Sequence, residues 1–239
     1  HQVTAVDISA ESIETARRML AENPYKEGFG SLRYEVCAFE QIADLALEQI
    51  DVIHFSVALH HMRDVRETID CCSEMLGEGG HIFVHEPCHE RFLDRDAAQV
   101  VLIRSLLSLT GHWYQPDAFD DMLTDMERMQ EEVEDTRREY FLERDKDEPE
   151  GQSPHDLQSS GAEMLSSLRA RFEEVDYRRS TSFIYRLLGG IRGDEKTVHR
   201  LADLLATYDR LAVREGYMNE NFFYFLGRKG PRPATGSDS

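Results

Sequence analysis

The sequence predicts a doubly wound α/β fold, and three observations carry this prediction. Short apolar segments typical of strands alternate with amphipathic, helix-like segments over residues 1–90. Strands separated by helices need crossover connections, which make neighbouring strands parallel. The segment 51–55 is mostly apolar, as expected of a strand covered on both faces. With 239 residues, 41% of them hydrophobic, the chain suits one large domain or one domain with an insertion.

The first part of the chain alternates regularly between strands and helices. Asp7 or Ser9 is placed to cap the first helix, and Asn23-Pro24 ends it. Three glycines at 77, 79 and 80 end the last helix of this part before a final strand. The expected elements are strand Val3–Val6, helix Ala10–Glu22, strand Leu32–Val36, helix Ile42–Leu47, strand Asp51–Phe55, helix Val65–Leu76 and strand His81–Val84.

After Pro87 the pattern changes to long helices, followed by an antiparallel pair of strands at the end. The expected elements are helix Arg91–Leu109, helix Asp117–Arg144, a mobile loop Lys146–Ser160, helix Ala162–Arg171, strand Phe172–Ile184, helix Glu195–Arg214 and strand Asn221–Gly227. We therefore predict a partial α/β core at 1–90, a helical insertion or lid at 91–171, the C-terminal part of the core at 172–229 and a disordered tail at 230–239.

The charge disfavours two classes of partner. The formal net charge is −19, from 46 acidic and 27 basic residues. Nucleic-acid backbones and anionic membranes require clustered Lys and Arg, so neither is expected as the main partner. The four cysteines have no zinc-ligand spacing and no apolar run approaches the ~20 residues of a membrane span, which favours a reduced, cytoplasmic protein. The oligomeric state is not readable from these features.

Three segments carry a resemblance to a known family. Residues 50–61 read IDVIHFSVALHH, residues 76–87 read LGEGGHIFVHEP, and residues 3–7 read VTAVD. Together they resemble a class I S-adenosylmethionine-dependent methyltransferase of the small-molecule type. The resemblance implies a Rossmann-like, mostly parallel sheet with an antiparallel C-terminal strand pair and a helical insertion. It also implies that the chain is truncated at its N-terminus, because the family's first strand and glycine-rich loop are missing before residue 1.

The ends of two strands carry candidate residues for binding the nucleoside part of the cofactor. Asp7 lies at the carboxyl end of a strand, where a carboxylate either caps the next helix or binds a ribose diol. The resemblance implies that Asp7 and Ile8 hold the ribose of S-adenosyl-L-methionine. At the next strand end the family often carries an Asp for the adenine, where this chain has Cys37. Ala38 and Phe39 are expected to hold the adenine beside it, although Phe39 is equally suited to the core.

The loop after strand 51–55 is the most specific local signal. The resemblance places Ser56, Val57 and Ala58 against the methyl-donor end of the cofactor. Imidazole has a pKa near 6.5, which suits a general base, so the adjacent histidines of this loop are candidate catalytic groups. A structural, hydrogen-bonded His pair is the alternative. The predicted catalytic residues are His60, His61 and Glu86.

The substrate is expected to be a small molecule held near the same sheet edge. His85 ends a strand beside the previous one, and Trp113-Tyr114 precedes the acidic helical segment as a lid or as a packing anchor. The predicted substrate residues are His85, Trp113 and Tyr114. The histidines around Glu86 and Cys88 lack tight ligand spacing, so no metal site is predicted.

These observations predict a methyltransferase that uses S-adenosyl-L-methionine on an unidentified small molecule. Three alternatives stay open. A nicotinamide-dependent oxidoreductase would also use a strand-end acid such as Asp7, although it would not account for the Leu-His-His segment. A non-catalytic methyltransferase-like binding module fits the departure at Cys37. An inactive fragment of an active parent fits the missing first strand.

Overall fold

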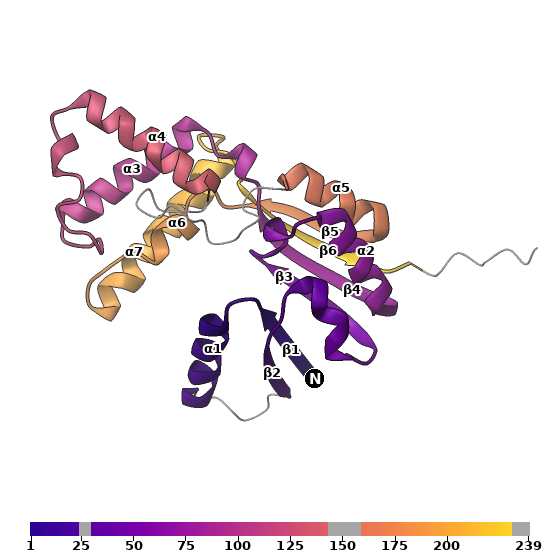
Figure 1. Cartoon of the computed structure of the whole chain (residues 1–239). Helices are drawn as coiled ribbons and strands as arrows, with labels where there is room; N and C mark the ends of the chain where they lie inside the picture. Colours follow the sequence, from indigo (N-terminus) through magenta and orange to yellow (C-terminus); the bar gives the residue numbers. More distant parts are fainter. Residues whose placement is uncertain (24–29, 143–158, 231–239) are drawn as a thin grey trace, which may run out of the picture. The chain divides into compact units, whose positions relative to one another are not determined.

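The structure is a computed structural model that describes residues 1–23, 30–142 and 159–230 (Figure 1). The chain divides into two compact units, residues 1–50 and residues 51–239. No helix in the described part of the chain combines the length and the apolar character that crossing a membrane requires.

The first unit is one β-α-β motif followed by a short helix. Strand β1 (Gln2–Asp7) pairs in parallel with β2 (Ser31–Val36), and α1 (Ala10–Glu22) connects them. Ser9 caps α1, since its hydroxyl accepts a hydrogen bond from the N–H of Ser12 at 3.1 Å. The following 3₁₀-helix η1 spans Phe39–Leu45. The prediction of a parallel strand pair joined by a capped helix is confirmed here.

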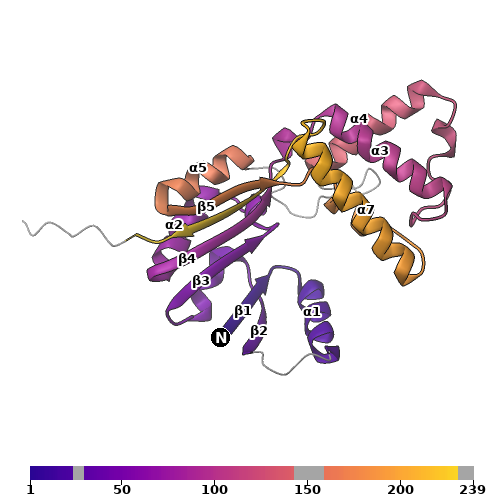
Figure 2. The same cartoon turned by 180° about the vertical axis from the view of Figure 1, so that it is seen from behind.

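The second unit is built on a four-stranded mixed sheet in the order β3-β4-β6-β5. Its β3 and β4 point the same way (Figure 2), whereas β6 is antiparallel to both β4 and β5. The antiparallel C-terminal pair was predicted and is confirmed. The strands are β3 (Ile50–Ser56), β4 (Leu76–Pro87), β5 (Glu173–Ser180) and β6 (Phe222–Arg228).

One face of this sheet is covered by two helices. Figures 1 and 2 show α2 (Val65–Met75) and α5 (Gly161–Arg171) together on the same side. Alternate residues of β4, namely Ile82, Val84 and Glu86, have no exposed surface on this side. The residues between them, such as His85, face the other side of the sheet.

The other helices of the second unit form a cluster with its own apolar core. In Figure 1 they lie beyond the end of the sheet, and α4 lies along α3. One short helix, η2 (Leu59–His61), lies against β4 and α5 instead. The elements of the cluster are η3 (His89–Arg91), α3 (Asp94–Leu109), η4 (Asp120–Met122), α4 (Met126–Leu142), α6 (Tyr185–Leu188) and α7 (Glu195–Arg214). Their shared core includes Val100, Leu107, Trp113, Tyr140, Phe183, Leu187 and Ala212.

Three predicted element boundaries are wrong for identifiable reasons. The predicted strand 172–184 ends at Ser180, because the carboxylate of Asp209 accepts hydrogen bonds from the N–H groups of residues 182, 183 and 184 and turns the chain. The predicted helix 117–144 begins only at Met126, after Asp117 takes a positive φ of 62°. Strand β4 already starts at Leu76 and runs through the glycine segment, where Gly79 has φ 74°.

The predicted α/β fold class is confirmed, and among the described residues its strands are divided between two sheets. The described residues contain one parallel pair in the first unit and one mixed four-stranded sheet in the second. No strand among them hydrogen-bonds to both β1 and β3, which would be needed to join the two sheets. The missing first strand and the domain boundaries at 90, 171 and 229 stay predictions, and the predicted loop 146–160 and tail 230–239 lie almost entirely outside the described residues.

Candidate active site

The first unit presents an exposed carboxylate at the end of β1. Oδ1 of Asp7 accepts a hydrogen bond from the N–H of Ser9 at 2.7 Å, so this carboxylate also orders the turn into α1. Its Oδ2 takes no hydrogen bond from the described residues. Ile8 is 59% exposed beside it. Asp7 therefore serves the turn with one oxygen and offers the other to solvent or to a ligand.

The end of β2 is tied directly to the end of β1. The N–H of Cys37 donates to the carbonyl oxygen of Asp7 at 3.0 Å, which places the predicted ribose and adenine residues side by side. The Cys37 side chain is buried and its thiol donates to the Ala38 carbonyl at 3.1 Å. The thiol is therefore engaged within its own loop, and Phe39 beyond it is half-buried. What this loop offers to a ligand is its backbone and the Phe39 ring.

In the second unit, a buried carboxylate organises the loop after β3. Oε1 of Glu86 accepts hydrogen bonds from the N–H groups of Ala58 and Leu59, each at 2.8 Å. Oε2 of Glu86 lies 2.5 Å from Nδ1 of His60, and both side chains are fully buried. Hydrogen bonds to an ionised acceptor are about twice as strong as those between neutral groups. Glu86 thus holds three consecutive residues of the loop in one conformation.

This loop is strained at the residue that leaves the strand. Val57 has φ 54°, a left-handed conformation that is a genuine outlier for a β-branched side chain. Its N–H donates to the carbonyl oxygen of His85 at 2.9 Å, and its side chain is 42% exposed. Strain of this kind costs of order 1–3 kcal/mol and clusters at functional sites. Ser56 and Val57 are therefore exposed to solvent, while Glu86 fixes the backbone of the residues that follow them, Ala58 and Leu59.

The predicted catalytic residue Glu86 and the predicted substrate residue His85 do not share one surface. Side chains alternate along β4, so Glu86 points to the face covered by α5, whereas His85 points to the opposite face. The two neighbouring residues therefore cannot line one crevice. Glu86 and His60 are placed to position the loop rather than to touch a substrate. His61 is half-buried, with its ring centroid 4.0 Å from that of His60. The catalytic assignments themselves stay predictions.

His85 belongs to a cluster of rings at the end of the sheet. Its imidazole stacks on Tyr224 with ring centroids 4.2 Å apart and an interplanar angle of 3°. Tyr185 and Phe222 lie 5.5 and 5.2 Å away from it. Burial lowers the pKa of His85, a nearby Glu86 opposes this shift and His54 adds to it. The ring is therefore neutral at physiological pH.

The structure does not bring Trp113 and Tyr114 to this cluster. They follow α3, whose 16 residues cover about 24 Å at 1.5 Å per residue, and Figures 1 and 2 show that its far end lies away from the sheet. Trp113 is 5% exposed and packs on Gly190, where it bridges to Ile191. Trp113 is an anchor of the helical cluster, which was the alternative reading of this aromatic pair.

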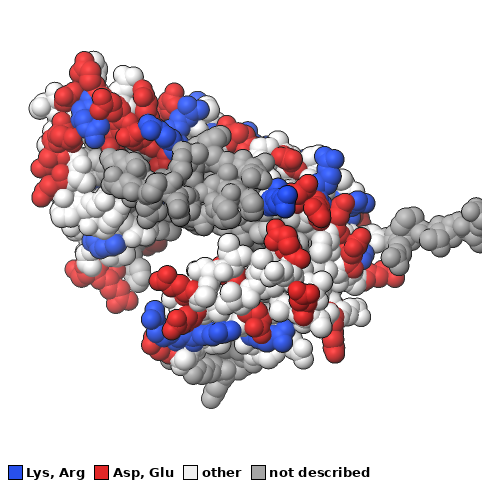
Figure 3. Space-filling view, in the orientation of Figure 1, with Lys and Arg blue, Asp and Glu red and all other residues white. Residues whose placement is uncertain are grey.

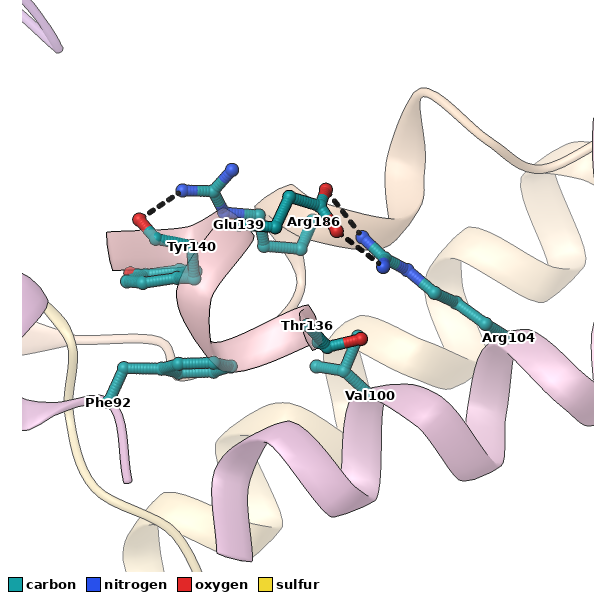
Figure 4. A pocket seen from close by; sticks show the side chains of 7 residues that line it. All are labelled: Phe92, Val100, Arg104, Thr136, Glu139, Tyr140 and Arg186. Atoms are coloured by element: carbon teal, nitrogen blue, oxygen red, sulfur yellow. Dashed lines mark hydrogen bonds and ion pairs between the residues drawn. The ribbon is translucent and has the colours of Figure 1, made fainter. Parts of the chain in front are cut away.

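A cavity of about 260 Å³ lies beside these two aromatic residues. It is lined by Arg104, Trp113, Tyr114, Gln115, Ala118, Phe119, Glu132, Asp135, Thr136 and Glu139. Figure 4 shows neighbouring contacts of α4: Arg104 of α3 reaches both carboxylate oxygens of Glu139, and Arg186 of α6 donates to the carbonyl of Tyr140. The ion pair closes one wall of the cavity and ties the two helices together.

The acidic surface over α4 is partly neutralised by ion pairs. Figure 3 shows acidic side chains gathered over this helix with basic ones between them. Arg128 pairs with Asp121 and Glu131, and Arg138 pairs with Asp135. Exposed pairs of this kind contribute little to stability, about 0–1 kcal/mol each. The described residues also contain no group of three or more potential metal ligands.

The N-terminal part of the chain is similar to a known family. Residues 1–84 match the family described as "Methyltransferase domain". The match covers β1, the Asp7 turn, the Glu86-held loop and most of β4, but it ends before Glu86 itself. The class I S-adenosylmethionine-dependent resemblance is thereby confirmed for this part of the chain.

Individual relatives match a stretch of similar length. The human "Ubiquinone biosynthesis O-methyltransferase, mitochondrial" is 28% identical over 82 residues, which are 34% of this chain and 22% of the relative. The corresponding enzyme of Idiomarina loihiensis is 30% identical over 82 residues, 34% of this chain and 32% of the relative. The chain thus spans about a fifth to a third of these relatives.

Solved structures align over nearly the whole chain but only loosely. An S-adenosylmethionine-dependent methyltransferase from Methanosarcina mazei gives a TM-score of 0.49 at 16% identity, covering 97% of this chain and 83% of that protein. The N-methyltransferase NodS from Bradyrhizobium japonicum gives 0.44 at 13% identity, covering 96% and 67%. Such values do not bear on function.

Sequence reasoning missed the residues that β5 and β6 bring to the sheet end. These are Ser180, Thr181, Tyr185, Asn221 and Tyr224. The strands were expected, but which side chains lie opposite His85 depends on the pairing register. The segment Phe222–Arg228 holds one tyrosine, Tyr224, and no local signal in it indicates which side of the sheet that ring faces.

Proposed function

We propose that the protein is an S-adenosyl-L-methionine-dependent methyltransferase that acts on a small molecule. The observation that carries the proposal is the buried Glu86 carboxylate, which fixes the backbone of Ala58, Leu59 and His60 at the end of β3. A rigid, strained loop at the carboxyl end of a strand is where α/β proteins bind ligands. The match of residues 1–84 to the methyltransferase domain supports the same reading.

The chain offers suitable groups for each part of the cofactor. The exposed Oδ2 of Asp7 suits a ribose hydroxyl, with Ile8 beside it. Because the Cys37 thiol is engaged within its own loop, the adenine is assigned to the backbone of this loop and to the Phe39 ring. The methionine end is assigned to the exposed residues Ser56 and Val57 and to Ala58, which follows them. These assignments rest on the two units separately.

When bound, the cofactor supplies a methyl group on a sulfonium, which is already a good leaving group. The work left to the chain is orientation, exclusion of water and removal of one proton where the acceptor carries one. Glu86 and His60 orient the loop from beneath it. His61 and His85 lie outside that buried pair and are the candidate proton acceptors.

The acceptor is proposed to be small. The names of two relatives specify an O-methyltransferase of ubiquinone biosynthesis, and O-methylation of a small molecule is the corresponding proposal for this protein. The net charge of −19 makes nucleic acid an unsuitable main partner. A cytoplasmic location is also only a proposal, since the name of the human relative places that enzyme in mitochondria.

The test is binding of S-adenosylhomocysteine to the natural full-length protein, measured by calorimetry. Asp7→Ala should weaken binding at least ~10-fold, because about 1.5–3 kcal/mol is lost for a hydrogen bond to a charged acceptor. Asp44→Ala is the matched control, since Asp44 is an exposed aspartate of η1 in the same unit. Equal affinities of the Asp7→Ala variant and the natural protein would remove Asp7 from the site.

The same measurement separates the alternatives. Binding of a nicotinamide dinucleotide instead of S-adenosylhomocysteine would establish an oxidoreductase. Binding of S-adenosylhomocysteine without methyl transfer to any of a panel of hydroxylated small molecules would favour a non-catalytic module.

A further inference from the structure

We propose that the cavity between α3 and α4 is a binding site for a small organic cation, namely an ammonium group attached to a flat, apolar body. The cavity has a volume of about 260 Å³, which suits a molecule smaller than a typical drug. Every residue that lines it belongs to the stretch 104–139 of the second unit. The proposal therefore does not depend on the methyltransferase function.

The cavity is separate from the strand ends that carry the cofactor residues. None of the residues assigned to the cofactor lines it. Arg104 lies well beyond the start of α3 at Asp94, about 15 Å along the helix axis at 1.5 Å per residue. In Figures 1 and 2 this part of the helical cluster lies away from the sheet of the second unit. A ligand bound here would occupy a site of its own.

One wall of the cavity is a polar stripe along α4. Glu132, Asp135, Thr136 and Glu139 all line the cavity. Their spacing along the helix is i, i+3, i+4 and i+7, which places the four side chains on one face. This face therefore offers three carboxylates and one hydroxyl to the same space.

The carboxylates of the stripe outnumber the cations of the wall. Among the described residues, Arg104 is the one basic residue that lines the cavity, and it pairs with Glu139 at 3.1 Å. The other two carboxylates pair with Arg128 and Arg138, neither of which lines the cavity. The wall itself is therefore negatively charged, which attracts a cation and repels an anion.

The stripe also contains a buried hydroxyl without a partner. Thr136 is 3% exposed, and its Oγ1 has no hydrogen-bond partner among the described residues. In Figure 4 this oxygen points away from Phe92 and Tyr140, toward the side on which Arg104 lies. Of these three neighbours, only Arg104 lines the cavity. Buried polar groups without partners are rare, and an ammonium N–H would supply the donor that Oγ1 lacks.

A second wall of the cavity is aromatic. Trp113, Tyr114 and Phe119 line it from the segment that connects α3 to η4. Trp113 and Phe119 are each 5% exposed and are fixed by the core of the helical cluster, whereas Tyr114 is 46% exposed. Flat apolar groups stack on such rings, and ring faces also attract cations. Rings on one wall and carboxylates on another are the combination that recognises an organic ammonium.

Calorimetry with three ligands of similar shape tests the preference for a cation. Phenethylamine carries an ammonium group, 2-phenylethanol is its neutral analogue, and 3-phenylpropanoate carries a negative charge. The natural full-length protein should bind phenethylamine at least ~10-fold more tightly than 2-phenylethanol, because a charge-assisted hydrogen bond is lost in the alcohol. Binding of 3-phenylpropanoate should be undetectable. This comparison needs no variant.

Two variants test whether the cation binds in this cavity. Glu132→Gln removes one charge of the stripe and should weaken phenethylamine binding about 10-fold. Glu134→Gln is the matched control, because Glu134 is an exposed acid of the same helix that does not line the cavity. Thr136→Val keeps the shape of the side chain but removes its hydroxyl, and should weaken binding about 5-fold.

Three results would overturn the site. The first is phenethylamine binding that is undetectable or is equalled by 2-phenylethanol. The second is an affinity that is unchanged in both Glu132→Gln and Thr136→Val. The third is equal weakening in Glu132→Gln and Glu134→Gln, which would show a general attraction of the cation to the acidic surface over α4.

Discussion

Nδ1 of His60 lies 2.5 Å from Oε2 of Glu86, and neither side chain has any exposed surface. The pair sits beneath the loop that follows β3, and the other carboxylate oxygen of Glu86 binds the N–H groups of Ala58 and Leu59. A carboxylate removed from water needs partners of this kind, because its desolvation is costly. The loop conformation and the buried charge therefore depend on each other.

Replacement of Glu86 by Gln should destabilise the protein by about 1–3 kcal/mol. The amide has one acceptor oxygen, whereas both oxygens of the natural carboxylate take part in hydrogen bonds with Ala58, Leu59 and His60. Urea unfolding measures the loss. Glu78→Gln is the control, because Glu78 lies exposed on the same strand. Equal unfolding midpoints for the two variants would show that Glu86 does not stabilise the loop.

The second expectation concerns pH and His85. Burial lowers the pKa of its imidazole, so the unfolded chain binds the proton more readily than the folded chain. The stability that depends on the neutral ring is present above about pH 6.5 and is lost as the pH falls through the lower folded-state pKa. His85→Phe should therefore lose less stability than the natural protein on acidification.

Urea unfolding of both proteins at about pH 7.5 and about pH 5.5 brackets this window. His54→Phe is measured alongside to separate the effect of His85 from that of its neighbour. The same acid loss in the natural protein and in His85→Phe would show that His85 does not titrate with folding.

Asp209 shapes the turn that carries Tyr185. Its carboxylate accepts hydrogen bonds from the N–H groups of Ser182, Phe183 and Ile184 at 2.7, 3.2 and 2.9 Å. Asp209→Asn puts an amide nitrogen against these donors and should destabilise the protein by about 1–3 kcal/mol. Thermal unfolding is the measurement and Asp203→Asn, at an exposed position of the same helix, is the control. A melting temperature equal to that of the control would mean that the turn forms without Asp209.

Trp113 and Gly190 are packed so closely that a side chain at 190 has no room. A Cβ there would lie 2.1 Å from the Trp113 ring, whereas a Cβ at Gly189 would meet nothing within 4 Å. Gly190→Ala should cost about 1–3 kcal/mol through overpacking. Gly189→Ala should be neutral or slightly stabilising. Because Trp113 is the chain's single tryptophan, its fluorescence reports the change directly. An unchanged spectrum and midpoint in Gly190→Ala would refute this packing.

The order of elements and the family resemblance came from the sequence alone. Periodicity located the helix Ala10–Glu22 with its Ser9 cap, because both signals are local and need no partner from elsewhere in the chain. The apolar strand 51–55 and the antiparallel strands at 172 and 221 were equally local. The Leu-His-His segment indicated the family for the same reason, because a short motif of consecutive residues can be read without knowing any tertiary contact.

The tertiary structure decided which of these residues meet. Alternation along β4 sends Glu86 to the covered face and His85 to the other, and the register of β6 sets Tyr224 against His85. The length of α3 removes Trp113 from the sheet end, and Asp209, far along the chain, ends β5 at Ser180. Contacts of this kind depend on pairing register and on helix length in space. They arise only when distant segments pack, so no local pattern in the sequence records them.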